Sequence, residues 1–156
     1  MTEPMNRRYM ILSALALAGC GGRSDAPKAA RDVPLYPNET PELRALIGKY
    51  ADLYDVPVDL VQRVIVREST HRPGARNGPY FGLMQILPQT ARTMGFRGDP
   101  FELLDAETNL RYAVKYLRGA WLVSGRDRDD AVMWYARGYY YEAKRLGLLK
   151  ETGLRS

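Results

Sequence analysis

The sequence predicts an all-α fold, a compact bundle of short helices around a buried central helix, with little or no sheet. Apolar residues recur at helical spacing after residue 41, and no segment alternates with the period of two that a half-buried strand requires. Proline, glycine, Asp and Thr stand where such helices should begin and end. A chain of 156 residues, 46% of them hydrophobic, has enough apolar material for one domain with a core.

Residues 1–19 are typical of a secretory signal, because Arg7 and Arg8 precede an apolar run that is too short to span a bilayer. The run ends at Cys20 in the sequence Leu-Ala-Gly-Cys, which resembles the signal of bacterial lipoproteins. That resemblance implies a lipid on Cys20 and a protein that faces the periplasm from a membrane. Gly21 is not an inner-membrane aspartate signal, so the outer membrane is expected. A plain signal peptide with an incidental cysteine is the alternative.

Residues 20–40 are predicted to be a flexible, lipid-anchored tether, since they contain Gly, Ser and three prolines without an apolar period. The predicted domain covers residues 41–150, and residues 151–156 form a C-terminal tail. Its first helix begins at Thr40-Pro41, where a capping hydroxyl precedes a proline at the first helical position. Pro57 opens the second helix.

Three further helical segments follow a loop that is rich in Gly and Pro. Pro88 and Gly95 bound a short helix, and Asp105 and Gly125 bound a longer one. We expect the last helical stretch to continue without a break after Asp129 and Asp130 to Gly147.

Composition excludes several kinds of site. The formal net charge of +5 is modest and the basic residues are scattered, so a nucleic-acid partner is not expected. One Cys and one His rule out an internal disulfide and a Cys/His zinc site, and no Asp-rich loop has EF-hand spacing. The sequence therefore predicts neither a metal nor a cofactor.

Glu68 stands at an apolar position of the second helix. At about 100° per residue it lies roughly 20° from Val61, on the arc that also carries Val64. A carboxylate aimed at a core is unfavourable unless it is paired or protonated. Partial burial and the C-terminal end of a helix both raise a carboxyl pKa, which suits a general acid near neutral pH. A Glu that reaches solvent or pairs with Arg67 or Arg72 is the structural alternative.

Four motifs, in order, resemble the lytic transglycosylases that share the goose-type lysozyme fold. They are Glu68-Ser69 with a Pro-x-Ala turn at 73–75, Gly-Leu-Met-Gln-Ile at 82–86 followed by Pro88, Asn109-Leu110 with Tyr116-Leu117, and Trp-Tyr-Ala-Arg-Gly at 134–138. The resemblance spans about residues 43 to 147. It implies a lysozyme-like helical domain.

The resemblance also implies a reaction and a set of site residues. The family's substrate is peptidoglycan, cut at the β-1,4 bond from N-acetylmuramic acid to N-acetylglucosamine so that a 1,6-anhydro end remains. Glu68 matches the catalytic acid/base, and the hydroxyl of Tyr135 is expected to approach its carboxyl group. The residues expected to bind the glycan strand are Ser69, Asn77, Met84, Gln85, Tyr116 and Tyr135. The protein is expected to act as a monomer.

Two alternatives stay open. Ala136 stands where the family usually has Asn, and this favours a noncatalytic peptidoglycan-binding lipoprotein on the same fold as one alternative. A muramidase-type hydrolase would need a second carboxylate beside the bond. His71, the only histidine, is expected to be exposed in the loop after Glu68.

Overall fold

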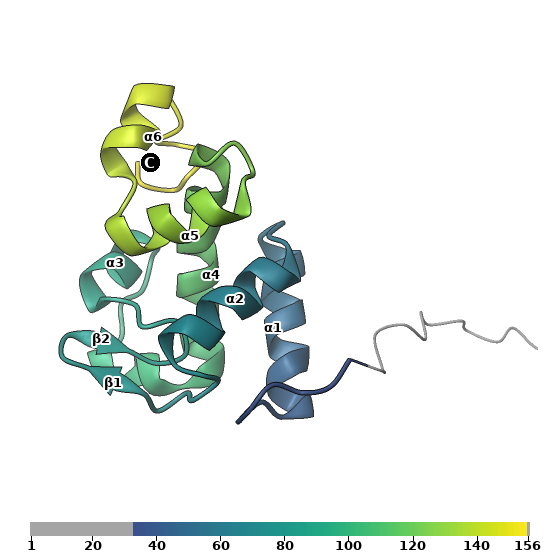
Figure 1. The fold of residues 1–156 in the computed structure, drawn as a ribbon. Helices are drawn as coiled ribbons and strands as arrows, with labels where there is room; N and C mark the ends of the chain where they lie inside the picture. Colours follow the sequence, from purple (N-terminus) through teal and green to yellow (C-terminus); the bar gives the residue numbers. More distant parts are fainter. Residues whose placement is uncertain (1–32, 156) are drawn as a thin grey trace, which may run out of the picture. The chain divides into compact units, whose positions relative to one another are not determined.

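The computed structural model describes residues 33–155, so the predicted signal segment, Cys20 and most of the predicted tether lie outside the described residues. Figure 1 shows helices wrapped around one another, with a small hairpin at one end. The all-α class is confirmed, because the two strands found in residues 33–155 are two residues long. In chain order the elements are α1 (Pro41–Leu53), α2 (Val58–Glu68), β1 (Arg76–Asn77), β2 (Tyr80–Phe81), α3 (Pro88–Thr93), the 3-10 helix η2 (Pro100–Leu104), α4 (Ala106–Val123), α5 (Arg128–Arg137) and α6 (Tyr140–Leu146).

The central helix is α4. It contacts α1, α3, α5, α6 and η2, and its face from Leu110 through Val114 to Leu117 is fully buried. Asp105 caps it as predicted, because its carboxylate accepts a hydrogen bond from the Thr108 amide at 2.8 Å. The apolar stripe of α4 therefore forms the middle of the core, and the shorter helices cover it.

The first two helices begin where the sequence predicts. The hydroxyl of Thr40 accepts from the Leu43 amide at 3.1 Å, and α2 starts directly after Pro57. The buried arc of α2 carries Val61, Val64 and Ile65. Because that arc runs the length of the helix, its next position, Glu68, falls at the edge of the core.

The expectation of one helical stretch from Asp129 to Gly147 is wrong, because α5 ends at Arg137 and α6 begins at Tyr140. Gly138 lies between them with φ +82°, a conformation that breaks a helix and that glycine adopts without strain. The break turns Tyr139 into the core, where its hydroxyl donates to the Tyr116 carbonyl at 2.8 Å. A Cβ on Gly119 of α4 would collide with that phenol, so the small residue makes room for the ring.

Residues 34–40, which we assigned to the tether, belong instead to the compact unit that begins at Pro34. We call residues 34–40 the strap. The Glu39 side chain has no exposed surface, and its carboxylate pairs with Arg44 of α1 at 2.7 Å. Among residues 33–155, no helix has both the length and the apolar character that crossing a membrane requires.

Candidate active site

Glu68 is the last residue of α2, and its side chain is 25% exposed. It lines a hollow of about 350 Å³ whose walls come from α2, the β1–β2 hairpin, the turn at Gln85 and α5. The carboxyl group is thus half-buried at a concave surface, which is the position predicted from the helical arc.

Burial raises the pKa of Glu68, because the charged form loses hydration that the protein does not replace. The positive charge of Arg67 acts in the opposite direction, with its Nε 3.5 Å from the carboxylate. Desolvation outweighs that attraction, so the pKa remains above its ordinary value. A carboxyl group in this state holds a proton to higher pH than an exposed Glu, as a general acid requires.

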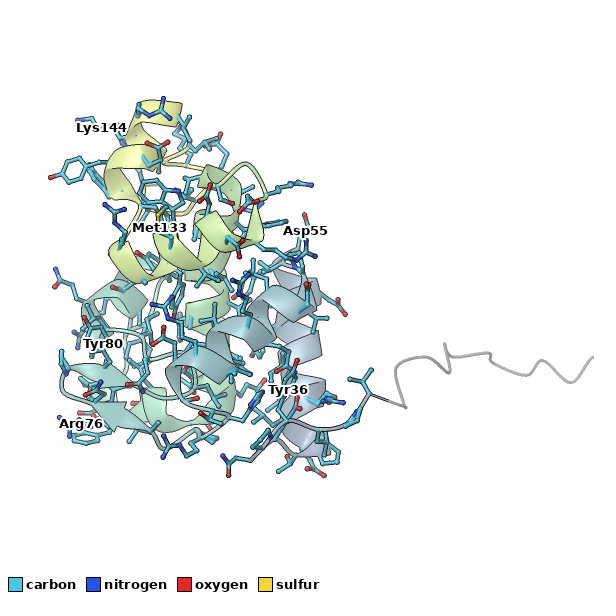
Figure 2. The ribbon with its side chains drawn as sticks, viewed as in Figure 1. Tyr36, Asp55, Arg76, Tyr80, Met133 and Lys144 are labelled. Atoms are coloured by element: carbon cyan, nitrogen blue, oxygen red, sulfur yellow. The ribbon has the colours of Figure 1, made fainter. Side chains whose placement is uncertain are left out.

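A second hollow, of about 270 Å³, continues the first. The two share Tyr80, Gln85, Tyr135 and Ala136, and the second extends past Thr90 of α3 and Tyr116 of α4. We call the joined hollows the Glu68 groove. In Figure 2 Tyr80 lies on the side of the hairpin that faces α3, and Arg76 lies on the opposite side. The groove is open, and its lining runs from Glu68 to Thr90 and Tyr116.

Glu68 is the only carboxylate among the residues that line the groove. Elsewhere in residues 33–155, no group of three or more His, Cys, Asp or Glu side chains is arranged to hold a metal ion. Acid–base chemistry in the groove therefore depends on one carboxyl group.

The turn at residues 82–85 reaches the groove through Gln85, and we call it the groove floor. It is held by Asn109, a fully buried residue of α4. Its amide nitrogen donates to the carbonyls of Phe81 and Leu103 at 2.9 and 2.8 Å, and its amide oxygen accepts from the Met84 amide at 3.0 Å. Gly82 crosses directly over this side chain with φ +74°, and a Cβ there would collide with the Asn109 amide. One polar side chain thus sets the path of residues 81–84.

Gln85 follows with a left-handed backbone, φ +48°, which is uncommon for a non-glycine residue. Its side-chain nitrogen donates to the carbonyls of Ala75 and Gly82 at 3.1 and 2.9 Å. These bonds tie the loop after Glu68 to the turn that forms the groove floor. Strain of this kind persists only where surrounding contacts determine the conformation, and it is frequent at functional sites.

Tyr135 of α5 is buried beside Glu68, and its hydroxyl donates to the Met84 carbonyl at 2.8 Å. Burial raises the pKa of the phenol well above its ordinary value, and the charge of Glu68 raises it further. The ring therefore stays neutral next to the carboxyl group. The one proton of the hydroxyl is directed at Met84, and Tyr135 and Glu68 line the same hollow.

The structure brings together most of the site residues that the sequence suggested. Asn77 and Gln85 line the hollow that holds Glu68, and Tyr116 lines its continuation. The Tyr116 and Tyr135 rings meet edge to face, with centroids 5.5 Å apart. Residues from α2, the hairpin, α4 and α5 thus converge on one groove.

Two of the expected substrate-binding side chains do not reach the groove. Met84 is completely buried and Ser69 is 2% exposed, so neither side chain meets a ligand in this fold. Met84 contributes through its backbone, whose carbonyl holds Tyr135. Ser69 caps the C-terminal end of α2, with its amide bonded to the Ile65 carbonyl at 3.0 Å.

The expectation that His71 is exposed is wrong, because its side chain is 1% exposed. The ring of Tyr36 from the strap stacks on it at 5.1 Å, and Gln62 of α2 lies 2.6 Å from its Nε2 atom. Burial lowers the pKa of His71. The sequence gives no sign of the strap that covers it.

Sequence reasoning missed the groove residues Tyr80, Thr90 and Arg137. Tyr80 could have been found, because Gly78-Pro79 makes a two-residue connection with glycine at φ +57°, a hairpin signal. The other two have no local signature. They reach the groove because residues of α3 and α5 border the same hollow.

Comparison with known proteins identifies one family. A protein-family model described as Transglycosylase SLT domain matches residues 45–150. No curated protein shows a significant match to this chain. The matched range contains every residue that lines the groove.

Proposed function

The chain belongs to the transglycosylase SLT domain family, lytic transglycosylases that act on peptidoglycan, and from this premise we propose that it cuts glycan strands with Glu68 as the single acid/base. The observation that carries the proposal is the half-buried Glu68 carboxyl, whose pKa is raised, in a groove with no other carboxylate. The product would be a 1,6-anhydro-N-acetylmuramic acid end.

The proposed reaction uses one proton twice. Glu68 donates its proton to the glycosidic oxygen as the bond from N-acetylmuramic acid to N-acetylglucosamine breaks. The resulting carboxylate accepts the proton of the muramoyl C6 hydroxyl, whose oxygen bonds to the anomeric carbon of the same sugar. Glu68 ends protonated as it began, and no water is consumed.

A single carboxylate suits this route better than hydrolysis. Glycosidases that use water or an enzyme nucleophile place two carboxyl groups on either side of the scissile bond. An internal hydroxyl is already held next to the anomeric carbon, so its effective concentration replaces a second carboxylate. The lining of the groove, with Glu68 as its only acid, supports the internal nucleophile.

A binding-only function is the second candidate, and Ala136 is the observation that favours it. Ala136 lines both hollows, so the groove wall beside Glu68 and Tyr135 carries a methyl group where an amide could have bonded to the sugar. A protein of this kind would hold peptidoglycan without releasing products.

Mass analysis of peptidoglycan fragments separates these functions. We expect the full protein to release anhydro-ended muropeptides from purified sacculi, and Glu68→Gln to lower that rate by at least about a hundredfold, the contribution of a positioned general acid. Gln keeps the size of Glu but cannot release a proton. Both proteins should still sediment with sacculi.

The matched control is Glu142→Gln, which changes an acid that pairs with Arg145 on α6, outside the groove. It should keep the full rate. Reducing ends in place of anhydro ends would show a hydrolase. Binding without any product from the parent protein would show the binding-only function.

The location of the reaction is part of the same proposal. A lipid on Cys20 would hold the domain at the periplasmic side of the outer membrane, beside its polymer substrate. In the same proposal the domain acts as a monomer.

A further inference from the structure

The strap makes a buried polar chain that ends in the loop after Glu68. The Glu39 carboxylate accepts from the Tyr36 amide at 2.9 Å, from Arg44 at 2.7 Å and from the side-chain nitrogen of Gln62 at 2.7 Å. Because that nitrogen faces Glu39, the Gln62 oxygen faces His71, at 2.6 Å from Nε2. The strap is therefore joined through α2 to a residue three positions beyond the candidate acid.

This chain fixes the state of the His71 ring. The Gln62 oxygen can only accept, so Nε2 of His71 carries the proton and donates it. Nδ1 is then an unprotonated nitrogen, and it is the one buried side-chain polar atom in residues 33–155 without a hydrogen-bond partner. Because no hydrogen bond holds Nδ1, packing must keep the His71 ring in place, and the Tyr36 ring packs against one of its faces.

The strap holds a strained turn. Thr70 and His71 are consecutive non-glycine residues in the left-handed region, with φ +52° and +58°. The Asn38 side chain donates to the Thr70 carbonyl at 2.9 Å, and Tyr36 stacks on His71. Left-handed residues in succession need such outside contacts, because the local backbone does not favour them.

We propose that the strap is a positioning element for Glu68, which it orients by holding the turn at Thr70 and His71 through Tyr36, Asn38 and the Glu39–Gln62–His71 chain. The turn begins two residues after the acid, and it starts the loop that returns to the groove at Asn77. A relaxed turn would move both the end of α2 and the wall that shields the carboxyl group. This inference rests on the proposed function of Glu68.

The test first removes the two contacts that the strap makes with the turn. A further substitution then relieves the backbone strain at Thr70, which those contacts hold in place. Tyr36→Ala with Asn38→Gly, where glycine accepts the φ of +64° found at Asn38, should lower the rate of anhydro-muropeptide release per folded molecule by about tenfold or more, as small displacements of catalytic groups do. Sedimentation with sacculi should persist. Adding Thr70→Gly, which accepts a positive φ without strain, should recover several-fold of the lost rate.

The matched control is Arg118→Ala. Arg118 donates to the Glu151 carbonyl at 2.7 Å across 33 residues, a side-chain-to-backbone bond like that of Asn38, which spans 32. It ties the C-terminal turn to α4 and should leave the rate unchanged. Thr70→Gly alone should bring no gain over the parent, because the intact strap already holds the turn.

Amide hydrogen exchange separates a local loosening of the turn from a loss of stability in the whole domain. The amides of Ser69 and Thr70 both bond to the Ile65 carbonyl at 3.0 Å. In the strap variant they should exchange faster while the core amide of Leu117 keeps its rate, and Thr70→Gly should slow them again. Faster exchange at Leu117 to the same degree would show that the strap stabilises the whole domain, which overturns the proposal.

Two activity results also decide the question. A strap variant that keeps the parent rate overturns the proposal, and so does a loss of rate that Thr70→Gly does not recover. If the parent itself releases no anhydro ends, the proposed function fails. In that case the exchange of Ser69 and Thr70 still reports whether the strap holds the turn.

Discussion

Glu39 and Glu68 are both partly or wholly buried, yet their surroundings shift their proton affinities in opposite directions. Burial by itself acts to raise the pKa of both carboxyl groups. Around Glu39, hydrogen bonds from Arg44, the Tyr36 amide and Gln62 outweigh burial and hold the pKa at about 2. Glu68 has only the Arg67 charge to oppose burial, so its pKa stays high. Hydrogen-bond partners, more than depth, therefore separate a structural carboxylate from a candidate acid.

The shift at Glu39 predicts a loss of stability in acid. The folded pKa lies below the ordinary value of 4.5, so the stabilisation is complete above pH 4.5 and is lost as pH falls toward about 2. A shift of this size corresponds to about 3 kcal/mol in the free energy of unfolding. His71 adds a loss at higher pH, because burial lowers its folded pKa and the unfolded chain takes up a proton first, from about pH 6.5 downward.

Urea unfolding at a series of pH values measures both effects. Glu39→Gln should flatten the fall in unfolding free energy between pH 4.5 and 2, and His71→Phe should flatten the fall that begins near pH 6.5. If the unfolding free energy of Glu39→Gln falls between pH 4.5 and 2 as steeply as that of the parent, the Glu39 carboxylate does not cause the loss of stability in acid. A slope below pH 4.5 will remain in the variant, because Asp59, Glu107 and Glu142 also have lowered pKa values.

At the scale of elements, α4 determines where the groove floor lies, and Asn109 is the residue through which it does so. Replacing Asn109 with Leu keeps the branched shape of the side chain but removes its hydrogen bonds to the Leu103 carbonyl and the Met84 amide. The Phe81 carbonyl loses its bond to Asn109 and keeps only the one from the Ile86 amide. We expect the free energy of unfolding to fall by about 2–6 kcal/mol, since two buried groups lose their partner and each unsatisfied buried group costs roughly 1–3 kcal/mol.

Thermal and urea unfolding test this expectation. Thr93→Val is the control, because it removes an exposed side-chain hydrogen bond on α3, and surface changes of this kind stay within about 0.5 kcal/mol. Equal, small losses for both variants would show that Asn109 does not hold the floor. The starts of α1, α2, α3 and α4 could be predicted, because caps and prolines are local signals. The break between α5 and α6 could not, because it depends on the space that Gly119 leaves for Tyr139.

At the scale of the whole molecule, the strap shortens the link between the domain and the predicted lipid. With residues 34–40 packed on the domain, residues 21–33 reach at most roughly 45 Å when fully extended. The proposed anchor would therefore keep the groove close to the membrane and restrict which glycan strands it meets.

Membrane fractionation of cells that express the full chain tests the anchor. Cys20→Ser should move the protein from the membrane fraction to the soluble fraction and abolish incorporation of labelled fatty acid, because no thiol remains to carry the lipid. Ser24→Ala, four residues further along, should change neither. A Cys20→Ser protein that stays in the membrane fraction would contradict the lipid anchor.

The sequence alone determined the helical class, most helix starts and the position of Glu68 at the margin of the core, because each depends on spacing and caps within a few residues. Motif order also indicated the family. Only the tertiary structure decided that Met84 and Ser69 turn inward, that the strap covers His71, and that Tyr80, Thr90 and Arg137 meet in one groove. These outcomes depend on contacts between residues far apart in the chain, and no local pattern records which of them pack together.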